Sequence, residues 1–210
     1  MSRWALVPVK ARAAGKGRLS AVLEERERVA LVQTMLEHVL QELGRCGQLD
    51  GIAVLSPEPH ALPAGSVWIN DAGAEMNAAI RAALSALTAR GATHAVIVAA
   101  DLPQLAAHEV SALIAASEGP GIAVAPDRHG GGTNALALAL PSDFVPHFGE
   151  QSFARHLAES LKLHIAPVIV RLPGLEFDVD VAEDLALLAA RHDPRYAWPP
   201  RPSTTSDKPR

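Results

Sequence analysis

Apolar segments of strand length alternate with amphipathic segments of helix length along most of this chain. Residues 94–100 form an apolar run typical of a central parallel strand, and residues 29–43 place apolar side chains at helical spacing. Further strands are expected at 4–9, 51–55, 67–70, 121–125, 134–140 and 163–171, and further helices at 75–90, around 110–114, at 152–161 and at 181–191. This alternation predicts a three-layer α/β/α domain around a mostly parallel sheet, with ligands at the carboxyl ends of the strands.

Composition narrows the class of protein. With 210 residues, the chain suffices for one domain, expected over 1–193, and the Pro-rich polar residues 194–210 predict a disordered tail. There is no apolar run of roughly 20 residues, no secretory signal and only one cysteine, Cys46, so we expect a cytoplasmic protein without a membrane span. The net charge of -4 argues against a nucleic-acid partner.

A basic loop follows the first predicted strand. The chain lacks both the GxxxxGK[ST] phosphate loop and the GxGxxG fingerprint, which disfavours P-loop enzymes and Rossmann dehydrogenases. Between residues 10 and 19, Gly15 and Gly17 let the backbone approach phosphates, and Lys16 and Arg18 supply positive charge. The segment fits a nucleoside triphosphate, although a solvated basic N-terminus explains it equally well.

Carboxylates lie at the ends of two other predicted elements, after a strand and before a helix. Asp101 ends the most apolar strand, where it suits a Mg²⁺ ion, or forms an Asx-type turn before Leu-Pro. Asp178 and Asp180 precede the last helix, and Asp180 with Glu183 has the spacing of a capping box. We therefore expect Asp101 and Asp178 to bind metal, while the choice between Asp178 and Asp180 stays open.

Two further loops have the composition of anion sites. Three glycines precede Thr133, which indicates either backbone N–H groups offered to an anion or a plain flexible hairpin. Gly149 and Ser152 open a helix, where they can bind an anion or where Ser152 serves only as an N-cap. His129 and His156 lie near these loops and are equally consistent with surface positions.

Together these motifs resemble the 2-phospho-L-lactate guanylyltransferase family of coenzyme F-420 biosynthesis, which has phosphoenolpyruvate and 3-phospho-D-glycerate variants. The resemblance covers about residues 4–191 and rests on VPVKARAAGKGRLS, Glu27-Arg28, MNAAIRAAL, AADLPQL, APDRHGGGTNAL, FGEQSFARH and FDVDVAEDL. Gly17 departs from the usual Ser, and Val181-Ala182 from the usual Thr-Pro. Neither departure removes a charge.

The resemblance implies a fold like that of molybdenum-cofactor guanylyltransferases and a role for each motif. It implies that Mg²⁺ binds at Asp101 and the D-x-D, and that GMP passes from GTP to a phosphorylated three-carbon acid with loss of pyrophosphate. The remaining implied residues are Lys10, Lys16 and Arg18 at the triphosphate, Asn77 near the nucleoside, and Thr133, Gly149 and Ser152 at the acid.

Three questions stay open at this stage. The acceptor is phosphoenolpyruvate, 3-phospho-D-glycerate or 2-phospho-L-lactate. The alternatives in function are another nucleotidyltransferase of the same fold, which a GGxSxRMG-like first loop would mark, and a catalytically inactive nucleotide-binding protein. The oligomeric state is undetermined, so that a homodimer is neither predicted nor excluded.

Overall fold

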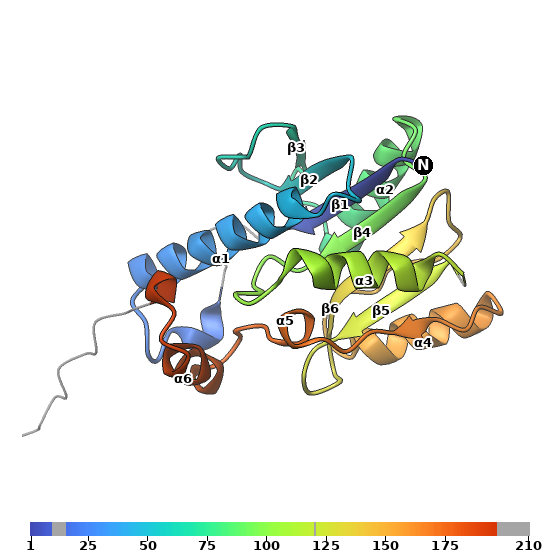
Figure 1. Cartoon of the computed structure of the whole chain (residues 1–210). Coiled ribbons are helices and arrows are strands. Elements are labelled where there is room, and N and C mark those ends of the chain that lie inside the picture. The colour runs from blue at the N-terminus through green and yellow to red at the C-terminus, as the bar shows by residue number, and fades with distance from the viewer. Residues whose placement is uncertain (10–15, 120, 197–210) are drawn as a thin grey trace, which may run out of the picture.

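The computed structural model describes residues 1–9, 16–119 and 121–196. Its strands form one seven-stranded sheet in the order β3-β2-β1-β4-β6-β5-β7 (Figure 1). Strand β6 pairs antiparallel with β4 and β5, whereas the other pairs are parallel. The strands are β1 (Arg3–Pro8), β2 (Gly51–Ser56), β3 (Ser66–Asn70), β4 (His94–Val98), β5 (Ile122–Pro126), β6 (Thr133–Ala139) and β7 (Val168–Ile169).

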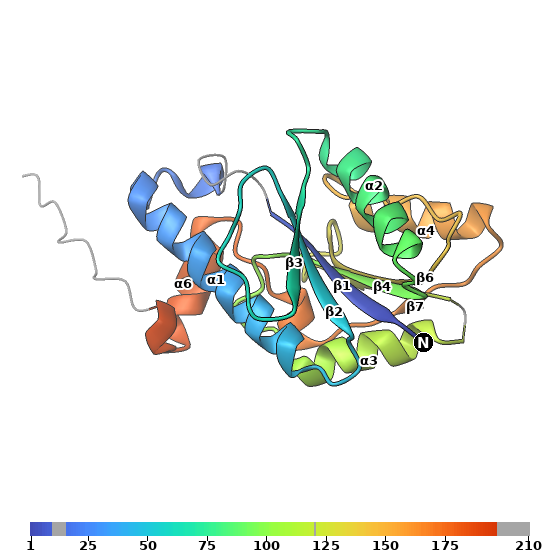
Figure 2. The ribbon, with the colours of Figure 1, turned by 90° about the horizontal axis from the view of Figure 1, so that it is seen from above.

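Helices cover both faces of this sheet. Figure 2 shows α1 and α3 on one side of the strands and α2 and α4 on the other. The α-helices are α1 (Glu25–Arg45), α2 (Met76–Ala89), α3 (Ala107–Ser117), α4 (Ser152–Lys162), α5 (Pro173–Glu176) and α6 (Ala182–Ala190), and the 3-10 helices are η2 (Gly17–Leu19) and η3 (Pro194–Tyr196). The predicted three-layer architecture with a mostly parallel sheet is therefore confirmed.

The central strands are buried because both of their faces carry apolar side chains. On one face Val96 and Val98 pack with Val39 of α1 in the larger core cluster. On the other face Ile97 packs with Ile80 of α2 in a second cluster. The continuous apolar run of β4 thus has the two-sided burial expected of a central strand.

The predicted strand at 163–171 is wrong over most of its length. Leu163 caps the end of α4 and His164 follows with a positive φ of 57°. Pro167 then lacks the N–H that a sheet ladder needs, so pairing is confined to Val168–Ile169.

The folded part of the chain also continues beyond the boundary expected at residue 193. Pro194–Tyr196 form η3, and Tyr196 is buried in a small third core cluster. Residues 194–196 thus belong to the described fold, whereas residues 197–210 lie outside the described residues and the disordered tail stays a prediction. The third cluster also contains Leu19, Phe177 and Val179, so it packs the end of the basic loop against the D-x-D segment.

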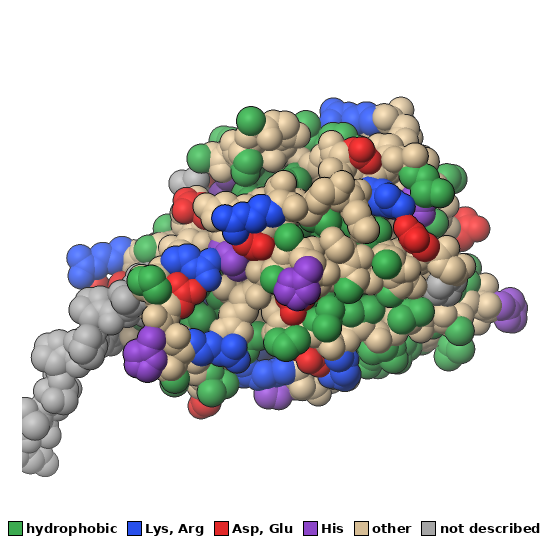
Figure 3. Space-filling view, in the orientation of Figure 1, with side chains coloured by type: hydrophobic (Ala, Val, Ile, Leu, Met, Phe, Trp, Pro, Cys, Tyr) green, Lys and Arg blue, Asp and Glu red, His purple; other side chains and the backbone are tan. Residues whose placement is uncertain are grey.

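On the face seen in Figure 3, acidic and basic side chains are interspersed rather than gathered into one basic surface. Within the described residues, no helix is both long and apolar enough to cross a membrane.

Gly174 in α5 occupies a position where a side chain does not fit. A Cβ atom there would overlap the Gln104 carbonyl oxygen and Glu109 Oε2. The Glu109 carboxylate is itself fixed, because it accepts from the N–H of Gly174 (2.8 Å) and of Ala106 (3.1 Å). We expect Gly174→Ala to lower the free energy of unfolding by about 3 kcal/mol in urea denaturation.

Gly44→Ala is the matched control for this prediction. Gly44 lies inside α1, and a Cβ there would meet no atom within 4 Å. Alanine in a helix interior should raise the free energy of unfolding by up to about 1 kcal/mol, since it loses less conformational entropy than glycine. Equal stability of the Gly174 variant and the wild type would show that α5 shifts freely.

Candidate active site

The antiparallel strand β6 brings the Gly-rich loop to the carboxyl end of β4. The Ala99 N–H donates to the Asn134 carbonyl at 2.8 Å, which extends the ladder beyond Val98. Thr133 at the start of β6 and Asp101 after β4 consequently lie at the same edge of the sheet. This is the edge at which ligands bind in open α/β folds.

Lys16 joins the basic loop to the predicted metal ligands. Its ammonium group forms ion pairs with Asp101 and with Asp180, the latter at 2.7 Å, and its side chain is only 8% exposed. Lys16 has a positive φ of 55°, a conformation that costs energy for lysine. Burial alone would lower the pKa of Lys16, but the two carboxylates outweigh burial and raise it. The ammonium is therefore held in place as a fixed positive charge.

The environment of Asp178 opposes its ionisation. Burial, followed by the negative charges of Asp101 and Asp180, raises the pKa of Asp178 to about 6. Three carboxylates here share the positive charge of Lys16, so negative charge is in excess. Within the described residues, however, no group of three His, Cys, Asp or Glu side chains forms a ready-made metal site.

The predicted capping role of Asp180 is wrong. Helix α6 begins one residue later than the Asp180–Glu183 spacing implies, with Val181 as N-cap. The carboxylate of Asp184 accepts from the backbone N–H of Asp180 (2.7 Å) and of Val181 (3.0 Å). Asp184 also forms an ion pair with Arg128. The Asp184 carboxylate thus holds the backbone of Asp180, and the side chain of Asp180 is left to pair with Lys16.

Two of the three glycines before Thr133 bind an anion, but that anion is a carboxylate of the protein itself. The N–H groups of Gly131 and Gly132 donate to the Asp127 carboxylate at 3.0 and 2.6 Å. A Cβ atom at Gly132 would lie 2.7 Å from Asp127 Oδ2, which explains the glycine. These two N–H groups are therefore already used, and the expectation that they are offered to a ligand is wrong.

Gly149 and Ser152 lie at the start of α4. Gly149 has a φ of 115°, which favours glycine, and a Cβ there would meet no atom within 4 Å. Ser152 is not the N-cap, because Gln151 takes that position and Ser152 is the first, buried residue of the helix. The space beside Gly149 is thus open to an approaching group.

Asn77 of α2 fixes the loop that carries Gly149. Its Nδ2 donates to the Phe148 carbonyl at 3.0 Å, and its Oδ1 accepts from the Phe148 N–H at 2.7 Å. Both ends of the amide are engaged by one backbone unit, which gives Asn77 a structural role. Its predicted contact with the nucleoside stays a prediction.

Thr133 is nearly buried beside His156 of α4. Thr133 Oγ1 lies 2.9 Å from His156 Nδ1, and the His147 N–H donates to His156 Nε2 at 2.8 Å. His156 is fully buried, so its placement at the surface, one of the two readings of the sequence, is excluded. His129 is exposed.

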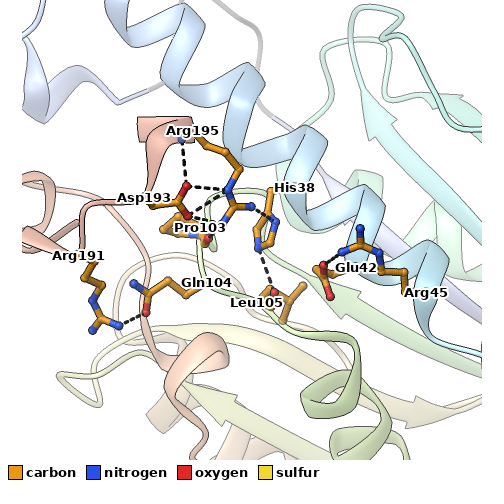
Figure 4. Close-up of polar contacts among 9 residues, drawn as sticks. All are labelled: His38, Glu42, Arg45, Pro103, Gln104, Leu105, Arg191, Asp193 and Arg195. Atoms are coloured by element: carbon orange, nitrogen blue, oxygen red, sulfur yellow. Dashed lines mark hydrogen bonds and ion pairs between the residues drawn. The ribbon is translucent and has the colours of Figure 1, made fainter. Parts of the chain in front are cut away.

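A cluster of polar contacts supports the segment that follows Asp101 (Figure 4). His38 Nε2 donates to the Leu105 carbonyl at 3.0 Å, since Nδ1 accepts from the guanidinium of Arg195. Burial, then the charge of Arg195, lowers the pKa of His38, which favours this neutral form. Arg195 also forms an ion pair with Asp193 at 2.5 Å. The C-terminal 3-10 helix thereby holds α1 and the segment after Asp101 together.

Two residues of the predicted site remain. Arg18 lies on η2 with an exposed side chain, and Lys10 lies outside the described residues. The sequence interpretation missed Asp127, Arg128 and Asp184. Their signal was present, because Asp127 lies three residues before the first of the three glycines and Asp184 follows Val181 at capping-box spacing.

Comparison with known proteins places this arrangement in context. A family model described as "Guanylyl transferase CofC like" matches residues 3–197. A phosphoenolpyruvate guanylyltransferase of Sphaerobacter thermophilus is 41% identical over 193 residues, which cover 90% of this chain and 93% of that protein. A phosphoenolpyruvate guanylyltransferase of Rubrobacter xylanophilus is 35% identical, with 93% and 98% covered.

Among solved structures, a 4-diphosphocytidyl-2C-methyl-D-erythritol synthase superposes with a TM-score of 0.61 at 15% identity. The match covers 91% of this chain and 99% of that one. At this identity the likeness concerns the fold alone, and it confirms the predicted nucleotidyltransferase fold.

Proposed function

The chain belongs to the family of CofC-like guanylyl transferases, and we propose that it transfers GMP from GTP to phosphoenolpyruvate in coenzyme F-420 biosynthesis. The observation that carries this proposal is the position of Lys16, whose buried ammonium lies between Asp101 and Asp180 at the edge of the sheet that also holds Thr133. A fixed cation and excess carboxylates, at the same sheet edge as a hydroxyl proposed to bind an anion, suit the joining of two phosphorylated substrates.

The chemistry requires little from the protein beyond positioning and charge. The acceptor phosphate is itself the nucleophile, since the second pKa of such a group is about 6. One of its oxygens forms a bond to the α-phosphorus of GTP while the bond to the bridging oxygen breaks and pyrophosphate leaves. Lys16, together with Arg18 and Lys10, is proposed to neutralise the triphosphate, so that no general base is needed.

Mg²⁺ is the proposed cofactor, with Asp101 and Asp178 as ligands. Carboxylate oxygens are the donors that this hard cation prefers. The raised pKa of Asp178 supports the fit, because it reflects burial first and then the negative charges of Asp101 and Asp180, which Lys16 alone does not compensate. Asp180 does not cap the helix and joins them as a third candidate ligand. When bound, the metal supplies further positive charge to the triphosphate oxygens.

The acceptor is proposed to bind at Thr133, Gly149 and Ser152. We expect Thr133→Val and Ser152→Ala to raise the KM for phosphoenolpyruvate about tenfold, because each leaves a ligand oxygen without a donor. The KM for GTP should change less than twofold in initial-rate measurements. Weaker GTP binding with an unchanged KM for the acid would place these loops at the nucleotide instead.

Pyrophosphate release tests the proposal as a whole. The purified protein is incubated with Mg²⁺ and GTP, together with phosphoenolpyruvate, 3-phospho-D-glycerate or 2-phospho-L-lactate in parallel. We expect the fastest release with phosphoenolpyruvate. Equal turnover with ATP would contradict the choice of GTP, and tight GTP binding without release in any arm would indicate an inactive nucleotide-binding protein.

A further inference from the structure

His156 occupies a position that joins three parts of the proposed acceptor site. It belongs to α4, contacts Thr133 at the start of β6, and accepts from the backbone N–H of His147, two residues before Gly149. Phe144 and Phe148 pack against its ring, with centroids 5.7 and 5.0 Å away. A fully buried imidazole with both nitrogens engaged is fixed in orientation.

The two hydrogen bonds determine which ring nitrogen carries the proton. A backbone N–H can only donate, so His156 Nε2, which the His147 N–H approaches at 2.8 Å, must be an unprotonated acceptor. In the neutral ring the proton is then on Nδ1, which donates to Thr133 Oγ1 at 2.9 Å. Burial, then the charge of His147, lowers the pKa of His156 to about 4, which agrees with a neutral ring at physiological pH.

The direction of this bond sets the role of the Thr133 hydroxyl. Because one lone pair of Oγ1 accepts from His156, the hydroxyl proton has to point elsewhere. Among the residues that the structure describes, Thr133 Oγ1 has no hydrogen-bonding partner besides His156. The hydroxyl is thus oriented as a donor, which matches a phosphate or carboxylate oxygen and disfavours a ligand group that only donates.

We propose that His156 is a positioning residue of the acceptor site, which orients the Thr133 hydroxyl to donate to an anionic oxygen of the phosphorylated acid. This inference rests on the proposed function, since it takes Thr133 as an acceptor-binding residue. His156 does not touch the acid and acts through Thr133. Its ring nitrogen Nε2 also holds the backbone of His147 close to Gly149, so one side chain aligns both loops.

His156→Gln separates these contacts. The glutamine amide reaches the position of Nε2 and can accept from the His147 N–H, but leaves Thr133 without the donor at Nδ1. We expect the KM for phosphoenolpyruvate to rise about tenfold with the KM for GTP unchanged. His108→Gln, at an exposed position on α3, is the matched control and should leave both constants unchanged.

A double-mutant cycle with Thr133→Val tests whether His156 acts through Thr133. If it does, His156→Gln adds less than twofold to the KM of the Thr133→Val variant. Effects that multiply would overturn the proposal, because they would show that His156 acts independently of Thr133. A parallel rise in the KM for GTP would also overturn it, because it indicates a general loss of structure.

The tautomer itself is measured without turnover by ¹⁵N NMR of the histidine rings in the wild type. We expect His156 to carry its proton on Nδ1 and to stay neutral down to about pH 5. A proton on Nε2 would refute the inference even if the enzyme is active. The expected tautomer in a protein that releases no pyrophosphate with any acid would instead refute the proposed function and leave the orientation of Thr133 established.

Discussion

Replacing Asp178 by asparagine should abolish GMP transfer and at the same time make the metal-free protein more stable. The amide keeps the shape of the side chain but removes a charge that the folded protein disfavours. Burial and the carboxylates of Asp101 and Asp180 raise the pKa of Asp178 from 3.8 to about 6. Such a shift corresponds to about 3 kcal/mol at neutral pH, and solvent screening of this partly exposed group reduces the expected gain to about 1–2 kcal/mol.

The pH dependence of this gain has a definite sign. The folded protein binds the Asp178 proton more tightly than the unfolded chain, so the wild type loses stability as the pH rises from 3.8 to about 6. The stability difference between Asp178→Asn and the wild type should therefore be near zero below this window and reach its full value above it. Urea denaturation in EDTA at a series of pH values measures the difference.

Two further measurements complete this test. Asp143→Asn, at an exposed position before α4, is the control and should change neither stability nor transfer. Pyrophosphate release should fall at least about a hundredfold in Asp178→Asn, because a neutral amide is a poor ligand for a hard cation. A variant that is less stable than the wild type at neutral pH would show that the Asp178 carboxylate is compensated after all.

Most of the sheet could be predicted because its strands are apolar over their whole length. The apolar composition of residues 94–100 alone predicted β4, and the observed strand His94–Val98 lies inside that range. The antiparallel direction of β6 was not predictable from such runs, since buried strands of either direction are equally apolar. Where apolar residues were interrupted by Pro167, the predicted strand reduced to Val168–Ile169.

The candidate site was predictable in its residue types and less so in its partners. The site brings together Lys16, Asp101 and Asp180, although 164 residues separate the first from the last. They come close because the strand order places the segments that carry them at one edge of the sheet. Which group each backbone N–H donates to depends on the exact residue at which a helix begins or a loop turns. At the start of α6 the carboxylate of Asp184, and not that of Asp180, accepts from the N–H of the N-cap residue Val181. The glycine loop turns around Asp127 rather than around a ligand. Helix boundaries and turn geometry at this scale are not encoded in residue periodicity.

Lys16→Met should slow GMP transfer yet tighten Mg²⁺ binding in the absence of GTP. Methionine keeps the unbranched stem of this nearly buried side chain and removes only the ammonium group. That ammonium is proposed to neutralise the triphosphate, so transfer should fall at least about a hundredfold. In the metal-free protein the same ammonium pairs with Asp101 and Asp180 and thereby competes with any other cation for their oxygens. Its removal should lower the Kd for Mg²⁺ about tenfold.

Titration calorimetry with Mg²⁺ and pyrophosphate release give the two halves of this result. Lys162→Met is the matched control, because it removes an exposed ammonium that pairs with Glu159 at 2.8 Å on α4, and both quantities should stay unchanged. Weaker Mg²⁺ binding in Lys16→Met would mean that Lys16 organises the carboxylates rather than competing for them. Unchanged transfer would remove Lys16 from the triphosphate. Tighter Mg²⁺ binding together with slower transfer would indicate that the Lys16 ammonium pairs with the carboxylates in the free protein and with the phosphates of GTP during transfer.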